Sequence, residues 1–310
     1  MLGNKGKKKE KKALREEENK LVDKETRDND RKALEEYLKK TMINKDMPFT
    51  ISEAYKAART NIMFSLKDSK QSKSIIVTSA NPGEGKSTTC VNFAISFAQM
   101  GAKVILLDMD MRKPRVHKYF GIRNRKGVSN ILGGFSTIDS CVVHDDETGI
   151  DIITAGHIPP NPAELIASSE TDIMLEKLTK EYDYVFIDTP PANVVTDTLL
   201  LSKKVTGVVM VARYKITNKD AFDRCVKTFE HAGVKMIGVV LNSVERNAYE
   251  GRYTYKSYGR YGYKRYGYGK YGYSKYGYSK YGYTKYGYNK YSYSYGDEVP
   301  EELTAEATKK

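Results

Sequence analysis

The sequence has few of the features that mark membrane, secreted and disulfide-stabilised proteins. Its 310 residues contain no apolar run near the roughly 20 residues that a transmembrane helix needs. The first residues, MLGNKGKKKEKK, lack the apolar core of a signal peptide. Only three cysteines occur, Cys90, Cys141 and Cys225, and none shows a C-x-x-C spacing. We therefore expect a cytoplasmic protein whose thiols are buried or idle.

The charge of the chain is concentrated in its two ends. Residues 1–46 contain 15 Lys/Arg and 11 Asp/Glu, with few large apolar groups, and residues 249–295 contain 10 Lys/Arg and one Glu. Residues 296–310 form a short acidic end. The sequence predicts a nearly neutral globular domain over 47–248, of ordinary size for one domain. Residues 1–46 are expected to be a charged, disordered segment, with at most a weak, frayed helix around 33–38, because they have little to bury.

A nucleotide-binding pattern lies at residues 75–89, IIVTSANPGEGKSTT. A β-branched run leads into a Gly-rich turn and then into helix-compatible residues, which is the P-loop pattern with Ala80 in the first glycine position. Gly83 and Gly85 would let backbone N–H groups converge on phosphate oxygens. The expected nucleotide-binding residues are Gly83, Glu84, Gly85, Lys86, Ser87 and Thr88.

Two further apolar runs end in carboxylates. VILLDMDMRKP contains Asp108 and Asp110, and YVFIDTPP ends its apolar run at Asp188 in the Walker B form. Carboxylates at the carboxyl ends of parallel strands lie beside the nucleotide crevice. The P-loop hydroxyl of Ser87 and the Walker B carboxylate of Asp188 are therefore predicted to bind Mg²⁺ or its water.

Apolar runs and helical stretches alternate along the chain. Helices are expected over residues 51–66, 87–100, 162–180 and 219–231. Strands are expected over residues 103–107, 150–154, 207–212 and 236–241. This order predicts an α/β fold with a doubly wound, mostly parallel sheet. With the P-loop it resembles the P-loop NTPases of the ParA and MinD type.

The composition changes abruptly at Tyr249. Residues 249–295 hold 19 of the 25 tyrosines, and from Tyr261 the sequence repeats as Tyr-Gly-Tyr-x-Lys. A period of five matches neither helix nor strand, so we expect a flexible tail. Two other roles remain open for it: binding RNA through tyrosine stacking and basic side chains, and an inert solvated tail.

The three motifs and the tyrosine-rich end together resemble the bacterial tyrosine kinases of capsular and exopolysaccharide biosynthesis. The resemblance spans roughly residues 50–243. It implies a protein-tyrosine kinase that uses ATP and Mg²⁺, phosphorylates its own tail on a neighbouring copy, and regulates polysaccharide synthesis and export. The implied acceptors are Tyr261, Tyr263, Tyr266, Tyr268, Tyr271, Tyr273, Tyr276, Tyr278, Tyr281, Tyr283, Tyr286, Tyr288, Tyr291, Tyr293 and Tyr295.

The resemblance also implies roles for single residues. Lys86 and Ser87 would bind phosphate and Mg²⁺, and Asp188 would support the metal. Asp108 and Asp110 would help to place Mg²⁺ and would draw the proton from the attacking tyrosine, with Asp108 as the expected base. Arg112 completes the Asp-Met-Asp-Met-Arg motif and is counted with the catalytic residues.

The family also carries a Glu-x-x-Arg-x-x-Arg row for ring-shaped self-association, which reads here as Glu53, Lys56 and Arg59. Lys56 keeps the charge of the usual arginine but lacks its planar fork. Three partners are implied besides the homo-oligomer: a separately encoded transmembrane activator or polysaccharide co-polymerase that recruits the kinase to the inner face of the membrane, a cognate phosphotyrosine phosphatase, and protein substrates of polysaccharide synthesis.

One alternative is a ParA/MinD-like ATPase switch that phosphorylates nothing. Such proteins usually carry a second lysine early in the P-loop. Here Ala80, Asn81 and Pro82 fill that region. The missing lysine and the tyrosine-rich tail both favour the kinase.

Overall fold

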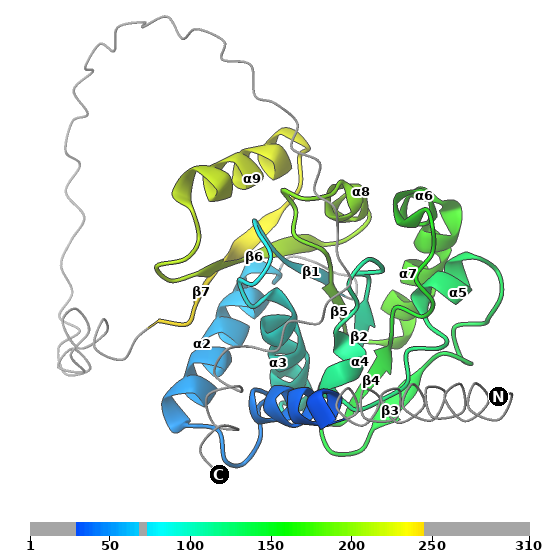
Figure 1. Cartoon of the computed structure of the whole chain (residues 1–310). Helices are drawn as coiled ribbons and strands as arrows, with labels where there is room; N and C mark the ends of the chain where they lie inside the picture. Colours follow the sequence, from blue (N-terminus) through cyan, green and yellow to red (C-terminus); the bar gives the residue numbers. More distant parts are fainter. Residues whose placement is uncertain (1–28, 68–72, 245–310) are drawn as a thin grey trace, which may run out of the picture. The chain divides into compact units, whose positions relative to one another are not determined.

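A seven-stranded sheet forms the centre of the protein (Figure 1). The computed structural model describes residues 29–67 and 73–244. The strand order is β3-β4-β2-β5-β1-β6-β7, and all neighbours are parallel except the antiparallel edge pair β3 and β4. The strands are β1 (Lys73–Ser79), β2 (Val104–Asp108), β3 (Val143–Asp145), β4 (Ile150–Ile153), β5 (Tyr184–Asp188), β6 (Gly207–Arg213) and β7 (Met236–Asn242). The predicted doubly wound, mostly parallel fold is confirmed.

The inner strands are buried on both faces because helices cover both sides of the sheet. In β1, Ile75 and Val77 pack into one apolar cluster, whereas Ile76 between them packs into the other. Side chains alternate along a strand, so a continuous apolar run is what a sheet covered on both faces requires. Burial on both faces explains why continuous β-branched runs in the sequence predict these strands.

The helices divide between the two faces. Helices α2 and α3 contribute to the first cluster, and α7 and α9 contribute to the second. Their bounds, with those of the shorter helices, are α2 (Phe49–Ser65), α3 (Lys86–Ala98), α4 (Val116–Tyr119), α5 (Val128–Leu132), α6 (Pro162–Ala167), α7 (Ser169–Glu181), α8 (Asp197–Ser202) and α9 (Lys219–His231).

Residues 29–40 are helical, contrary to the prediction that 1–46 is disordered with at most a weak, frayed helix around 33–38. Leu34 and Leu38 are buried on this helix, which packs into the same cluster as α3. Four positions separate the two leucines, so they share one helix face, and that narrow stripe is enough to dock the helix. The prediction was wrong for 29–46 because charged neighbours masked the stripe. Residues 1–28 lie outside the described part.

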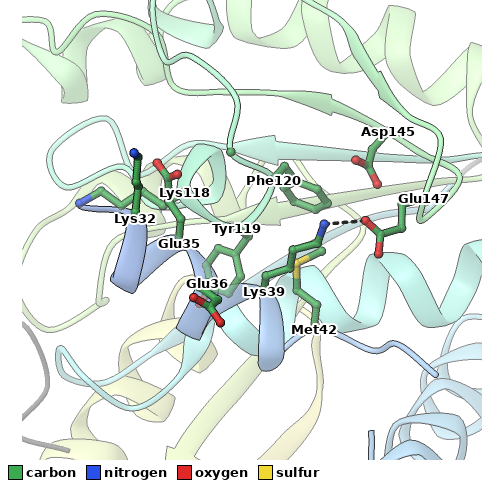
Figure 2. A pocket seen from close by; sticks show the side chains of 11 residues that line it. Lys32, Glu35, Glu36, Lys39, Met42, Lys118, Tyr119, Phe120, Asp145 and Glu147 are labelled. Atoms are coloured by element: carbon green, nitrogen blue, oxygen red, sulfur yellow. Dashed lines mark ion pairs between the residues drawn. The ribbon is translucent and has the colours of Figure 1, made fainter. Parts of the chain in front are cut away.

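The same helix lines a pocket of about 330 Å³ together with residues 118–121 and the turn between β3 and β4 (Figure 2). Across it, the Nζ of Lys39 lies 2.8 Å from a carboxylate oxygen of Glu147. Tyr119 and Phe120 contribute aromatic wall, and Met42 is buried beside them. The N-terminal helix is therefore part of the folded domain.

Asn92 joins the N-terminal elements to α3. Its side-chain oxygen accepts a hydrogen bond from the Ile43 N–H (2.7 Å), and its amide donates to the Thr41 carbonyl (2.9 Å) and to the Tyr55 hydroxyl (3.2 Å). Asn92 is almost fully buried. Because buried amides are costly when unpaired, these bonds fix the path of residues 41–43 against the helix that follows the P-loop.

One local prediction differs from the structure, and two short elements were not predicted. The helix expected over 162–180 is broken at Ser168, whose backbone is extended and whose hydroxyl donates to the Leu165 carbonyl. Serine competes in this way with helical hydrogen bonding. Strand β3 and helix α8 were not predicted, since three and six residues are too short for a periodic pattern.

The structure tests the predictions for the cysteines but not those for the C-terminal residues. The three cysteines are buried and unpaired, as expected. Among the described residues, no helix combines the length and apolarity needed to cross a bilayer. The tail over 249–295, the acidic end 296–310 and all the candidate acceptor tyrosines lie outside the described residues.

Candidate active site

The P-loop connects β1 to α3, as the sequence predicts. Gly85 caps α3 with φ at +91°, and Gly83 has φ at +79°, a backbone region that suits glycine. The N-terminal turn of α3 leaves N–H groups without helical partners and carries the positive end of the helix dipole. This turn provides an anion site of the kind that holds phosphate.

Glu84 holds the loop together rather than facing outward. Its carboxylate accepts hydrogen bonds from the Asn81 N–H (3.0 Å) and the Thr217 hydroxyl (2.7 Å), and the residue is almost fully buried. The Asn242 amide donates to the Glu84 carbonyl (3.1 Å). A Cβ added at Gly85 would lie 2.0 Å from that amide nitrogen. Asn242, at the end of β7, is a loop-supporting residue that the sequence motifs did not indicate.

Thr88 is also engaged within the protein. Its hydroxyl lies 2.7 Å from the Tyr119 hydroxyl on α4. Burial raises the pKa of Tyr119 to about 12, so the phenol stays protonated at neutral pH. Thr88 therefore links the nucleotide loop to α4.

Lys86 lies at the centre of the predicted constellation. Its Nζ is 3.1 Å from Asp110 Oδ2 and 3.6 Å from Asp188 Oδ1, and it donates to Ser87 Oγ at 3.2 Å. Burial disfavours the charged ammonium, but the carboxylates of Asp188 and Asp110 outweigh it and raise the pKa of Lys86. The three predicted Mg²⁺ ligands thus surround one cationic group.

Asp188 is the last residue of β5 and the register partner of Asp108 in β2. It is fully buried, and neither of its carboxylate oxygens has a hydrogen-bond partner among the described residues. Burial raises its pKa, although the Lys86 ammonium works in the opposite direction. Apart from the 3.6 Å ion pair with Lys86, this buried carboxylate lacks hydrogen-bond donors in the described part of the chain, so a metal ion or water would satisfy it.

These residues fit Mg²⁺, which prefers oxygen ligands and is usually held by one or two carboxylates plus substrate phosphates. Ser87, Asp110 and Asp188 supply the oxygens, and the Lys86 ammonium marks where a cation is favourable. Within the described residues, no three His, Cys, Asp or Glu side chains form a metal cage by themselves. The arrangement suits a metal that arrives with a phosphate.

Asp108 uses its carboxylate to organise the chain. Its Oδ2 accepts the Arg115 and Val116 N–H groups (3.1 and 3.0 Å), and its Oδ1 accepts the Asp110 N–H (3.2 Å). Burial, with Asp188 and Asp110 nearby, raises its pKa well above the usual value. The first two bonds satisfy donors at the start of α4, which is a capping role.

Arg112 points toward α8. Its Nε and Nη2 donate to the two carboxylate oxygens of Asp197 at 2.8 and 2.9 Å, a bidentate pair. The Asp197 side chain is completely buried. No motif spacing pointed to Asp197, because it lies 85 residues from Arg112 in the chain.

The proposed self-association row is partly engaged within the protein. Lys56 pairs with Glu53 at 2.8 Å, and Arg59 reaches across to donate to the Ser96 carbonyl on α3. Lys56 is exposed, and the other two are half-buried.

Comparisons with known proteins agree with this geometry. The family model described as "ParA: NUBPL iron-transfer P-loop NTPase" matches residues 70–267. Tyrosine-protein kinase YwqD of Bacillus subtilis (strain 168) is 40% identical over 191 residues, 62% of this chain and 80% of YwqD. Putative tyrosine-protein kinase CapB of Staphylococcus aureus is 36% identical over 206 residues, 66% of this chain and 90% of CapB.

A solved structure supports the same assignment. The kinase domain of the Escherichia coli tyrosine kinase ETK has a TM-score of 0.62 and 32% sequence identity, covering 67% of this chain and 80% of that one. The ParA-type fold and the kinase relatives together resolve the choice that the motifs left open. This chain belongs to the bacterial tyrosine-protein kinases built on a ParA-like P-loop NTPase domain.

Proposed function

We propose that this kinase transfers the γ-phosphate of ATP, bound with Mg²⁺, to tyrosines of its own C-terminal residues 249–295. The carrying observation is the buried cluster in which Lys86 lies between Asp110 and Asp188 at the end of the P-loop. It combines an anion site at the start of α3, a lysine ammonium and two buried carboxylates that face it. P-loop kinases need these components to hold nucleotide phosphates.

On binding ATP, the Lys86 ammonium would turn from the carboxylates to the β- and γ-phosphates. The α3 N-terminus would hold the phosphates through its amides, and Ser87, Asp110 and Asp188 would hold Mg²⁺. The metal would neutralise negative charge on the phosphate oxygens. Positioning and charge neutralisation of this kind supply most of the rate of phosphoryl transfer.

The transfer forms a bond from the phenol oxygen to the γ-phosphorus and breaks the bond to the β–γ bridging oxygen. A phenol has a pKa near 10, so its proton must leave during the reaction. Because Asp110 is assigned to Mg²⁺, Asp108 remains the proposed acceptor of that proton. Its carboxylate accepts three backbone N–H groups, and burial beside Asp188 and Asp110 raises its pKa well above the usual value, which makes it a stronger base.

We place this reaction in capsular or exopolysaccharide biosynthesis, between copies of the chain held in a ring. The proposed contact for that assembly is the row Glu53, Lys56 and Arg59. Within one copy Lys56 pairs with Glu53 and Arg59 bonds to Ser96, so assembly would have to add contacts to these. A tail carrying many phenols raises the local acceptor concentration to about millimolar for a tethered neighbour. The proposed partners are a transmembrane activator or co-polymerase, a phosphotyrosine phosphatase and protein substrates of polysaccharide synthesis.

The first experiment incubates the full chain with Mg-ATP and maps phosphotyrosine by anti-phosphotyrosine detection and peptide mass spectrometry. We expect phosphate on the tail tyrosines of the wild type and none on Lys86→Met. The Lys86→Met chain should keep its fold, which circular dichroism checks. Equal signal from both chains, or none from the wild type, would contradict the proposal and favour an ATPase switch.

A second experiment asks whether transfer occurs between copies. The Lys86→Met chain serves as the acceptor, and a full chain with every tail tyrosine changed to phenylalanine serves as the donor. Phosphotyrosine on the acceptor would support transfer between copies. An unlabelled acceptor beside an active wild type would instead indicate transfer within one chain.

A further inference from the structure

The bond between Arg112 and Asp197 joins two loops that serve the active site. Arg112 follows β2 and lies two residues beyond Asp110, whereas Asp197 begins α8, after the loop that leaves β5 at Asp188. Strands β2 and β5 are neighbours, with Asp108 paired to Asp188 in register. The bidentate pair therefore connects the exits of the two strands that carry the site carboxylates.

The Asp197 side of this connection is firmly attached. The Thr198 hydroxyl donates to the Pro190 carbonyl (2.7 Å), and the Thr78 hydroxyl of β1 donates to the same oxygen (3.0 Å). The Ala192 N–H donates to the Ser79 carbonyl (2.9 Å). These bonds anchor the β5 exit loop to the strand that leads into the P-loop, so Asp197 is a fixed point for Arg112.

Arg112 lies in the β2 exit loop, which also carries the active-site carboxylate of Asp110. In the same exit loop, Asp110 Oδ1 accepts the Lys113 N–H (3.0 Å), while its Oδ2 faces Lys86 (3.1 Å). A guanidinium gripped by both oxygens of a buried carboxylate allows little rotation or translation. The bond to Asp197 therefore also restrains the exit loop that carries Asp110.

We propose that Asp197 is a positioning residue for phosphoryl transfer, which acts through Arg112 to hold the Asp110 carboxylate in place at the nucleotide site. Asp197 is fully buried and bonds to Arg112, so the role assigned to it is indirect. The inference rests on the kinase reaction and adds to it a residue outside the three motifs. Small displacements of a reacting group can reduce a rate about a hundredfold.

The test compares Asp197→Asn with the wild type in the full chain. Nucleotide affinity is measured with a fluorescent ATP analogue, and kcat is measured as ADP release together with phosphotyrosine formed on the Lys86→Met acceptor. We expect kcat to fall about tenfold to a hundredfold, with nucleotide affinity and the unfolding midpoint little changed. An inactive wild type would count against the kinase reaction itself, whereas loss confined to the variant concerns Asp197.

Asp172→Asn is the matched control. Asp172 lies on α7, outside both exit loops, and pairs with Lys204, just beyond the other end of α8, at 2.6 Å. It should keep wild-type kcat. A similar loss in both variants would show that disturbing α8 is enough, and would overturn the proposal.

A double mutant isolates the path through Arg112. If Asp197 acts through that guanidinium, Arg112→Gln combined with Asp197→Asn should be no slower than the slower single variant, within about twofold. Multiplying effects would overturn the proposal, as would full activity of folded Asp197→Asn or parallel losses of kcat, affinity and unfolding midpoint. If Asp197→Asn does not fold, Arg112→Lys takes its place, because it keeps the charge but loses the bidentate grip.

Discussion

Three buried carboxylates share one ammonium at the active site, and this imbalance is the main residue-scale feature. Asp108, Asp110 and Asp188 are all nearly or fully buried, and Lys86 is the cation that contacts two of them. Like charges held together in a medium of low polarity destabilise the unliganded fold. The site is thus built for a bound cation at the expense of stability without one.

Asp188→Asn should reveal this conflict. Removing one negative charge without changing the shape should raise the melting temperature of the unliganded protein by a few degrees, about 1 kcal/mol. Mg-ATP-dependent tyrosine phosphorylation should fall sharply, because the carboxylate proposed to hold Mg²⁺ is lost. Differential scanning fluorimetry with and without Mg-ATP measures the first effect. A lower melting temperature in the unliganded variant would contradict this electrostatic account.

The two P-loop glycines should differ in their tolerance of alanine. Both have positive φ, which costs a residue with a Cβ about 1–2 kcal/mol. At Gly83 the added Cβ has nothing within 4 Å, whereas at Gly85 it would collide with Asn242. We expect Gly85→Ala to lose nucleotide binding and more stability than Gly83→Ala. Calorimetric titration with ATP and denaturant unfolding compare the two variants. Equal losses in Gly83→Ala and Gly85→Ala would show that the collision with Asn242 has no effect.

The sequence motifs predicted which residues form the cluster but not how each acts. Lys86, Asp110 and Asp188 come together because their strands are neighbours, which the motif order implies. Asp108 and Glu84 turn out to bind backbone groups, and Asp197 lies outside every motif. Such roles depend on which hydrogen-bond donors the folded loop places near each side chain. The spacing of residues in the sequence does not predict this.

At the scale of elements, the helix over 29–40 changes the boundary of the folded domain. It packs Leu34 and Leu38 into the core beside α3. We expect Leu38→Ala to lower the free energy of unfolding by about 2 kcal/mol or more, through lost burial and a cavity. Lys40→Ala on the exposed face should change it by no more than about 0.5 kcal/mol. Equal midpoints in urea would mean that the helix does not contribute to the fold.

The β3–β4 edge contains a histidine with a carboxylate partner. His144 Nδ1 lies 2.7 Å from Asp151 Oδ1, and this contact, with Asp146 and Asp145 nearby, raises the pKa of His144 above its usual 6.5. A raised pKa stabilises the fold below about pH 6.5, and the gain disappears as the pH rises through the folded value. The ring is more than half exposed, so the gain is small.

NMR titration of the His144 ring tests this pair directly. Asp151→Asn should return the pKa of His144 toward 6.5. It would also replace the acceptor of the Tyr182 hydroxyl, which lies 2.7 Å from Asp151 Oδ2, so Tyr182→Phe serves as the matched control. An unchanged titration in Asp151→Asn would exclude the carboxylate as the cause.

Strands and long helices were predictable because their periodicity follows directly from burial. The prediction for α9 matches its observed bounds, since Ala221, Cys225 and Phe229 repeat every four residues on its buried face. Short elements were missed for the opposite reason. Strand β3 contains a valine, a histidine and an aspartate, and its position at the sheet edge depends on pairing with β4.

At the scale of the whole molecule, charge is unevenly distributed along the chain. Residues 249–295 carry a net charge of +9 through ten basic residues and one Glu. Each phosphate adds about −1.5 to −2 charges, so about five or six would cancel the charge of the tail. We expect progressive phosphorylation to weaken tail-mediated docking and to loosen the assembly. Light scattering before and after ATP treatment measures it, and an unchanged mass despite heavy phosphorylation would contradict the expectation.

The hydrogen bonds of Asn92 have a practical consequence for expressing this kinase. A chain trimmed to begin at residue 47, where the composition first becomes ordinary, would lose both the Ile43 donor and the Thr41 acceptor. A buried amide on the helix that follows the P-loop would then face an empty surface, beside apolar groups that Leu34 and Leu38 had covered. Recombinant versions should therefore start upstream of residue 29. A shorter protein would expose apolar surface and would be prone to aggregation. Weak activity of such a protein would then reflect the truncation and not the enzyme.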